Sequence, residues 1–149
     1  DGAAAPRLIL DAGTGLRRVT GLLGGEPFAG TIILTHLHWD HVHGLPFFRA
    51  GDTPGAQVTL LLPPQPGGQA AEAVLAGCMS PQHFPITPGE LRGEWTFGTV
   101  PAEAFKAGPF EVEAHGRCWS DRRRHCWGRG MSPGSSLISR TNSRRSTRR

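Results

Sequence analysis

Apolar residues in the first part of the chain occur in short runs interrupted by glycine and proline. The runs at 7–11, 31–35 and 57–62 are aliphatic and partly β-branched, which predicts three short buried strands. Residues 110–114 alternate apolar and polar side chains, which is typical of a strand with one buried face. The first three runs lack this alternation, so we expect them to lie in a buried sheet.

Helices are predicted between these strands. Residues 16–23 favour a short helix that Gly24-Gly25 ends, and residues 45–48 form the apolar start of another. Residues 69–79 carry Ala, Glu and Leu at favourable helix positions, and a proline-punctuated loop follows at 80–88. Alternation of strands and helices predicts an α/β fold with helices layered on a sheet.

Charge divides the 149-residue chain near residue 116. The net charge of +4 is the sum of two unlike parts, because ten of the 16 basic residues but only one of the 12 acidic residues follow Gly116. Residues 1–116 carry −5 and residues 117–149 carry +9. The second part also loses its apolar periodicity, so we expect one acidic domain at 1–116 and a disordered Arg/Ser/Gly-rich tail at 117–149.

Several classes of protein are excluded by composition. No run approaches the roughly 18 apolar residues of a membrane span, so we expect no membrane association. Residues 1–6 lack both an initiator Met and a signal-peptide pattern, so we interpret them as an internal start and the chain as a fragment. Three widely spaced cysteines, Cys78, Cys118 and Cys126, do not form a disulfide framework and favour a reducing, cytoplasmic location.

The densest polar cluster lies directly after the second predicted strand. His36, His38, Asp40 and His41 form an H-x-H-x-D-H pattern within Thr35–Gly44. On an extended segment His36 and His38 point to the same side, and a tight turn brings Asp40 and His41 back toward them. Two pairs of ligands can hold two metals about 3.5–4 Å apart and activate a hydroxide between them.

Imidazole nitrogens and a carboxylate oxygen suit zinc. Two simpler interpretations are a His-rich surface loop without metal and a structural zinc site. The first rarely produces four ligand-type side chains at this spacing after a strand. The second is disfavoured by the aspartate and by the lack of nearby cysteine.

With these residues the chain resembles the metallo-β-lactamase-fold metallohydrolases over about residues 8–115. Residues 11–15 (DAGTG) are similar to the strand-end element of that superfamily, and residues 35–44 are similar to its metal motif. Residues 44–48, 79–81 and 84–86 resemble the branch of ribonuclease Z and the cyclic-phosphate phosphodiesterases. The resemblance implies the N-terminal half of an αββα sandwich, an α+β arrangement of two sheets between helices.

The resemblance also implies roles for single residues. His36 and His38 would bind a first metal, and Asp40 and His41 a second, with Asp40 also acting as general acid. Two zinc ions are expected in the complete domain, and manganese or iron stays open. Asp11 would lie behind the site and orient a metal-bound histidine, or else cap the next helix, and Thr35 would support the loop or simply end its strand.

The second half of the family's site has no match here. That half supplies a histidine in a His-Pro-Gly-like segment, a bridging aspartate and a final histidine. His115 is followed by Gly116-Arg117, His125 lies in an Arg-rich stretch, and no acidic residue follows Asp121. A frameshift near Gly116 would explain both the missing ligands and the basic tail, and sequencing the gene in all frames tests it.

The expected function is therefore a metal-dependent hydrolase, of phosphodiesterase type with a dinuclear zinc-bound hydroxide, acting on a small-molecule or nucleotide phosphodiester. As given, the chain should be weakly active or inactive, because each metal lacks ligands. Alternatives are a lactonase- or thioesterase-like hydrolase, and a non-catalytic fragment that binds RNA through its arginine tail. A zinc knot formed by the tail is a further, geometrically awkward option. The substrate-binding residues are not identified, and a homo-oligomer stays open.

Overall fold

The structure is a computed structural model that describes residues 5–114 and the backbone of Leu137–Arg140. The chain divides into two compact units, Asp1–Val100 and Pro101–Arg149, which are described separately below. The predicted metal motif lies in the first unit.

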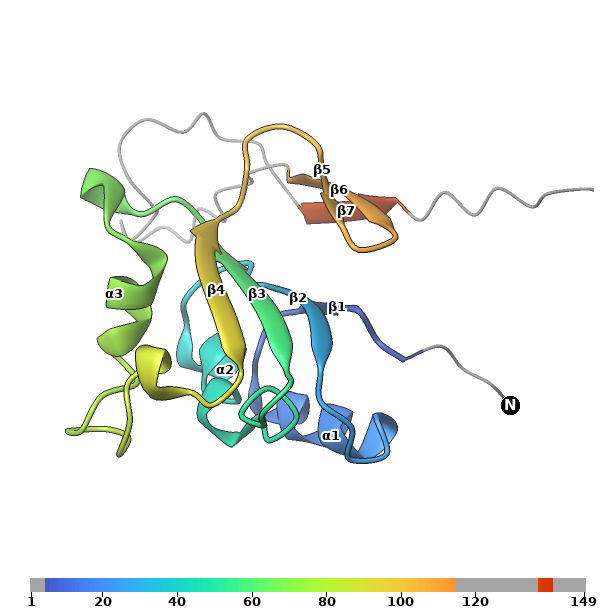
Figure 1. The fold of residues 1–149 in the computed structure, drawn as a ribbon. Coiled ribbons are helices and arrows are strands. Elements are labelled where there is room, and N and C mark those ends of the chain that lie inside the picture. The colour runs from blue at the N-terminus through green and yellow to red at the C-terminus, as the bar shows by residue number, and fades with distance from the viewer. Residues whose placement is uncertain (1–4, 115–136, 141–149) are drawn as a thin grey trace, which may run out of the picture. The chain divides into compact units, whose positions relative to one another are not determined.

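A four-stranded parallel sheet forms the centre of the first unit (Figure 1). Its strands are β1 (Leu8–Leu10), β2 (Ala29–Ile33), β3 (Gln57–Leu62) and β4 (Glu94–Thr99), and they lie side by side in sequence order. Parallel neighbours require each connection to return to the starting edge of the sheet. The segments between the strands are therefore long, and helical turns occupy them.

These helical segments are each only one or two turns long. Because such short helices are marginal on their own, packing against the sheet stabilises them. They are η1 (Thr14–Arg18), α1 (Val19–Leu22), α2 (Trp39–Val42), η2 (Leu45–Phe47), η3 (Pro66–Gly68), α3 (Ala71–Ala76) and η4 (Pro88–Glu90).

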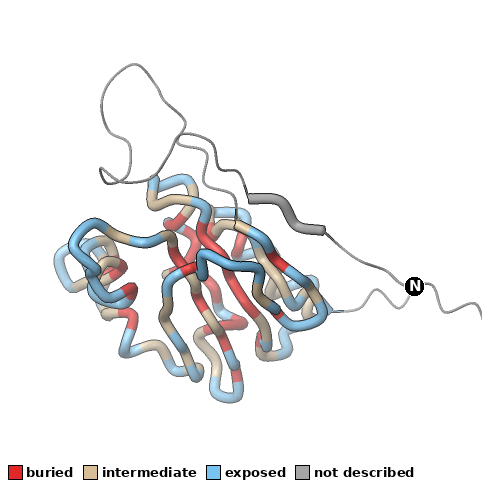
Figure 2. The backbone as a smooth tube through the Cα atoms, turned by 90° about the horizontal axis from the view of Figure 1, so that it is seen from above, coloured by how far each residue is buried: buried red, intermediate tan, exposed pale blue. Residues whose placement is uncertain are grey.

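One face of the sheet and the helices enclose the core. The strand register places Ile9, Ile32, Leu60 and Phe97 in one row across the four strands. Ile32 and Leu60 are completely buried, and the buried residues follow the inner strands in Figure 2. The helical segments cover this row with apolar side chains, including Leu16, Val42, Leu45 and Leu75.

The second unit contains a three-stranded antiparallel sheet in the order β5-β6-β7. Its strands are β5 (Phe105–Ala107), β6 (Phe110–Ala114) and β7 (Leu137–Arg140). Gly108, with a φ of 59°, allows the tight turn between β5 and β6. β7 falls within the segment predicted to be a disordered tail, and the rest of that tail lies outside the described residues. The domain boundary near residue 116 stays a prediction.

Three strands, β1, β3 and β6, lie where the sequence predicts them, and β2 begins two residues before its predicted start. The helix expected at 69–79 is shorter, since it spans only Ala71–Ala76. Ala70 has an extended backbone with a ψ of 139°, and Gly77 follows the last helical residue. β4 and β5 were not predicted, although β4 alternates polar and apolar side chains.

The predicted α/β fold class is confirmed, because a parallel sheet packs against helical segments in the first unit. Among the described residues, no helix has both the length and the hydropathy needed to cross a bilayer.

Candidate metal centre

The candidate site forms where β1 and β2 end side by side. Parallel strands present their carboxyl ends at one edge of the sheet, so the residues that follow β1 and β2 meet there. The Asp11 backbone N–H still donates to the Ile33 carbonyl at 2.8 Å, but Asp11 then turns with a φ of 62°. Such a left-handed backbone is uncommon outside glycine and is found mostly where surrounding contacts enforce it.

Thr35 makes the contacts that hold Asp11 in this left-handed conformation. Its backbone N–H donates to Asp11 Oδ1 at 2.8 Å, and its hydroxyl lies 2.8 and 3.0 Å from the two Asp11 carboxylate oxygens. The Thr35 hydroxyl also lies 3.0 Å from His36 Nδ1. No side-chain cap bonds the start of η1, so Asp11 contacts the metal motif and does not cap the following helix. The supporting roles predicted for Asp11 and Thr35 remain predictions.

The histidines of the motif converge as their spacing predicts. His38 lies on extended backbone before α2, and its ring centroid is 4.5 Å from that of His36. The one-turn helix α2 brings His41 back, so that its ring centroid lies 3.8 Å from that of His36. Asp40 Oδ2 lies 3.3 Å from His41 Nε2, and the Asp40 side chain is 77% exposed.

Backbone contacts hold α2 against the turn that follows β1. The Ala12 N–H donates to the His41 carbonyl, and the Gly44 N–H donates to the Ala12 carbonyl, both at 2.7 Å. A Cβ at Gly13 would overlap the Asp40 carbonyl oxygen, and one at Gly44 would overlap the Gly13 carbonyl oxygen. Only glycine permits this close approach at the two positions.

Two overlapping groups of side chains could each hold a metal ion. The ligand atoms of Asp11, His36 and His41 all lie within 4.8 Å of one another, and so do those of His36, His38 and Asp40. The sequence predicts a different grouping, with His36 and His38 on one ion and Asp40 and His41 on the other. In the structure His36 belongs to both groups. The Asp11 carboxylate lies as close to His36 and His41 as a metal ligand would.

The environment of His41 fits a metal ligand. Its Nδ1 is buried and lies 2.9 Å from Asp11 Oδ2, although the two atoms lack the alignment of a hydrogen bond. A proton on Nδ1 would face the Asp11 carboxylate and leave the Nε2 lone pair free, beside Asp40. Metal-binding histidines typically have such a carboxylate on the nitrogen that faces away from the ion.

Electrostatics favour a neutral His36. Burial lowers the pKa of this imidazole, and the nearby His41 and His38 lower it further, while Asp11 and Asp40 act in the opposite direction. A neutral imidazole is the form that binds zinc, so the lowered pKa favours metal binding at neutral pH. The donor set of imidazole nitrogens and carboxylate oxygens therefore fits zinc.

An open groove of about 360 Å³ lies beside this cluster. Asp11, Asp40 and His41 line its polar side. Its apolar side is formed by residues of β1, η1 and α1, namely Ile9, Leu10, Leu16 and Val19. This volume lies within the range of small-molecule sites, which are about 300–1,000 Å³.

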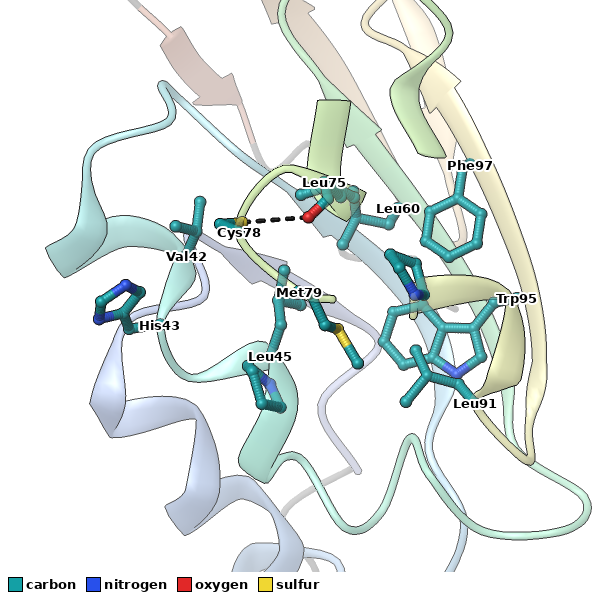
Figure 3. A pocket seen from close by; sticks show the side chains of 12 residues that line it. Val42, His43, Leu45, Leu60, Leu75, Cys78, Met79, Leu91, Trp95 and Phe97 are labelled. Atoms are coloured by element: carbon teal, nitrogen blue, oxygen red, sulfur yellow. Dashed lines mark hydrogen bonds between the residues drawn. The ribbon is translucent and has the colours of Figure 1, made fainter. Parts of the chain in front are cut away.

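A second, smaller cavity of about 20 Å³ lies between the helical segments and the sheet (Figure 3). Its walls include Leu60, Leu75, Met79 and Trp95, and His43 lies at its edge. The space would hold a single water molecule, but the walls offer almost no polar partners. Its small volume and apolar walls do not suit a charged substrate.

Cys78 also borders this cavity. Its thiol donates to the Leu75 carbonyl at 3.2 Å, the dashed line in Figure 3. Burial raises the pKa of the Cys78 thiol, which keeps it protonated and unreactive at neutral pH.

Sequence reasoning missed the two glycines that allow the site to form. Gly13 and Gly44 are the positions where backbones touch, and their signal was a glycine close after Asp11 and another at the end of the metal motif. Trp39 is expected from the sequence to pack over this loop, but its side chain is 72% exposed.

The chain is similar to a known protein in structure but matches none in sequence. No protein-family model and no curated protein sequence match the chain. The structure is similar to that of a diphosphatase from the PhnP family, with a TM-score of 0.55 and 18% sequence identity. The similarity covers 89% of this chain and 44% of that one, so the chain spans less than half the length of its structural neighbour. The chain therefore has the metallo-β-lactamase fold in partial form, as the metal motif and the strand-end aspartate predict.

Proposed function

We propose that this protein is a metal-dependent hydrolase of phosphodiesterase type. One observation carries the proposal: Asp11, His36, His38, Asp40 and His41 converge at the carboxyl edge of a parallel sheet in two overlapping ligand groups. The structural neighbour is described as a diphosphatase, which supports hydrolysis at phosphorus over the lactonase and thioesterase alternatives.

His36, His38, Asp40 and His41 would hold the metal, for which zinc is the best fit and manganese or iron an alternative. Bound ions of this kind polarise a phosphoryl oxygen and lower the pKa of water toward about 7. The net negative charge of residues 1–116 also supports a role for metal ions in substrate binding. A phosphodiester would be repelled by Asp11 and Asp40 unless cations offset their charge.

The protein's own residues have separate tasks in this proposal. The Asp11 carboxylate faces His41 Nδ1 at 2.9 Å and would favour the ring orientation that leaves the other nitrogen free for the ion. Thr35 holds the Asp11 carboxylate in place through its N–H and hydroxyl. Asp40 is the most exposed carboxylate of the cluster, so it is the candidate general acid for the leaving oxygen.

The adjoining groove supports a small-molecule substrate. Asp11, Asp40 and His41 belong both to the groove lining and to the candidate ligand groups, and the apolar lining residues can accept a substituent of the phosphoester. Since only two groups of three ligands occur among the described residues, we propose that this chain supplies part of a larger ligand set and hydrolyses its substrate slowly.

Zinc titration and hydrolysis of bis-p-nitrophenyl phosphate test the proposal together. We expect zinc-dependent turnover that is lost in Asp40→Asn, and zinc affinity that falls at least about tenfold in His36→Gln. Glu26→Gln and His83→Gln are matched controls, because both side chains are exposed and neither belongs to the ligand groups.

Zinc affinity that is equal in His36→Gln and His83→Gln would reject the metal centre. Turnover of a lactone or thioester without turnover of the phosphodiester would favour the other hydrolases of this fold. Two tightly bound zinc ions with fast turnover would contradict the incomplete ligand set.

A further inference from the structure

The groove beside the candidate metal centre combines charged and apolar lining residues. Asp11, Asp40 and His41 line it and also belong to the candidate ligand groups. Among the described residues that line the groove, none is a lysine or an arginine. A substrate phosphate can therefore meet bound metal there, but the groove offers no side-chain cation to a second anionic group.

Leu10 is the most exposed of the apolar residues that line this groove. It ends β1, directly before Asp11, and its side chain is 47% exposed. The other three apolar lining residues are held by the core, because Leu16 is buried in it and Ile9 and Val19 pack against it. The apolar lining is therefore largely fixed before a ligand binds, and Leu10 adds an exposed side chain next to the metal centre.

We propose that this lining binds the apolar ester substituent of a phosphodiester, with Leu10 and Val19 as specificity-determining residues. The site would then favour a singly charged phosphodiester with an alkyl or aryl group over one whose substituent is a sugar or carries further charge. This inference rests on the proposed phosphodiesterase function and names a substrate class for it.

The hydrophobic effect gives the size of this preference. Burying a methylene completely strengthens binding about fourfold, and burying it halfway in an open groove strengthens binding about twofold. A butyl group has three more methylenes than a methyl group, so it should bind about eightfold more tightly. A hydroxyl in the same place would lose hydrogen bonds to water, because the side chains of Leu10, Leu16 and Val19 offer none in return.

The chain contains a matched control for an exposed leucine. Leu22 lies in α1, as Val19 does, and its side chain is 75% exposed. It is not among the residues that line the groove. Leu22→Ser therefore removes an exposed leucine and leaves the proposed contact in place, whereas Leu10→Ser removes the contact itself.

The experiment measures the affinity of the zinc-loaded chain for three phosphodiesters of equal charge by NMR titration. The ligands are dimethyl phosphate, butyl methyl phosphate and 3-hydroxypropyl methyl phosphate, of which the last two differ only in a terminal methyl or hydroxyl group. We expect the butyl ester to bind about eightfold more tightly than dimethyl phosphate, and more tightly than the hydroxypropyl ester. Leu10→Ser should reduce the butyl preference to about threefold or less, and Val19→Thr should also lower it. Leu10→Met and Leu22→Ser should retain it.

Equal affinity for the butyl and methyl esters, or failure to bind the butyl ester, would overturn this inference even if bis-p-nitrophenyl phosphate is hydrolysed. The same butyl preference in Leu10→Ser and Leu22→Ser would also overturn it. Circular dichroism checks that Leu10→Ser is folded, and if it is not, an unchanged preference in Val19→Thr decides against the groove. A butyl preference that depends on Leu10 but occurs without hydrolysis of any phosphodiester would support the groove and reject the proposed function.

Discussion

Replacing Gly44 by alanine should disrupt the candidate metal centre from a position that binds no metal. Gly44 has a φ of −80°, which alanine adopts without strain, so only the added methyl group matters. That methyl would lie 2.7 Å from the Ala12 carbonyl oxygen and closer still to the Gly13 carbonyl oxygen. The 2.7 Å hydrogen bond from the Gly44 N–H to Ala12 would have to lengthen or break.

The structure allows an estimate of the cost. Inserting a methyl into a packed contact costs about 1–3 kcal/mol, and losing one hydrogen bond costs about 0.5–1.5 kcal/mol. The unfolded alanine variant has less conformational entropy than the glycine chain, which offsets about 0.4–1 kcal/mol of this destabilisation. We expect a net loss of about 2 kcal/mol in the free energy of unfolding, or about 10 °C in Tm for a unit of this size. Zinc affinity should also fall about tenfold or more, because the turn that carries Asp11 moves.

Thermal unfolding and zinc titration measure the two effects, with Gly21→Ala as the control. Gly21 lies in α1 and has open space where its Cβ would be, so this variant should be unchanged or more stable by up to about 1 kcal/mol. A Gly44→Ala protein that melts and binds zinc like Gly21→Ala would refute the argument that these backbones must touch.

Two further predictions concern carboxylates. Asp11→Asn should lower zinc affinity about 10–100-fold in a chelator competition assay, because the charge facing His41 Nδ1 is lost; an unchanged affinity would contradict the proposed orienting role. Glu90 accepts hydrogen bonds from the backbone N–H and the hydroxyl of Thr87, which lower its pKa. This stabilisation is present above its ordinary pKa of 4.5 and is lost as the pH falls through the lowered value, so Glu90→Gln should remove that part of the acid dependence of unfolding, measured from pH 6 to pH 2.

The sequence predicts the parts of the fold that local patterns encode. Aliphatic runs identify β1 to within one residue at each end and β3 to the residue, because strands that pack against a buried core carry mostly apolar side chains. β4 is not among the predicted strands, although Trp95 and Phe97 alternate with polar residues as in β6; its pairing with β3, more than thirty residues away, is visible only in the structure. The predicted helix at 69–79 was too long because Ala70 favours a helix locally yet is extended here.

Part of the candidate site can also be predicted from the sequence, and part of it cannot. Local spacing alone places His36, His38, Asp40 and His41 within reach of one another, since a turn of helix after an extended segment folds the chain back on itself. The chemistry of these side chains then points to zinc. The spacing within this motif does not predict which residues of other segments, such as Asp11, lie beside it.

Sequence patterns are therefore sufficient to predict the His/Asp motif, the strands on either side of it and the α/β class, because each depends on residues a few positions apart. The contacts of Asp11 with Thr35 and His41, and those of Gly13 and Gly44 with neighbouring backbone, become visible only in the folded chain. These contacts join segments more than twenty residues apart. They exist because parallel pairing of β1 and β2 brings two carboxyl ends to one edge of the sheet, an arrangement that no local pattern encodes.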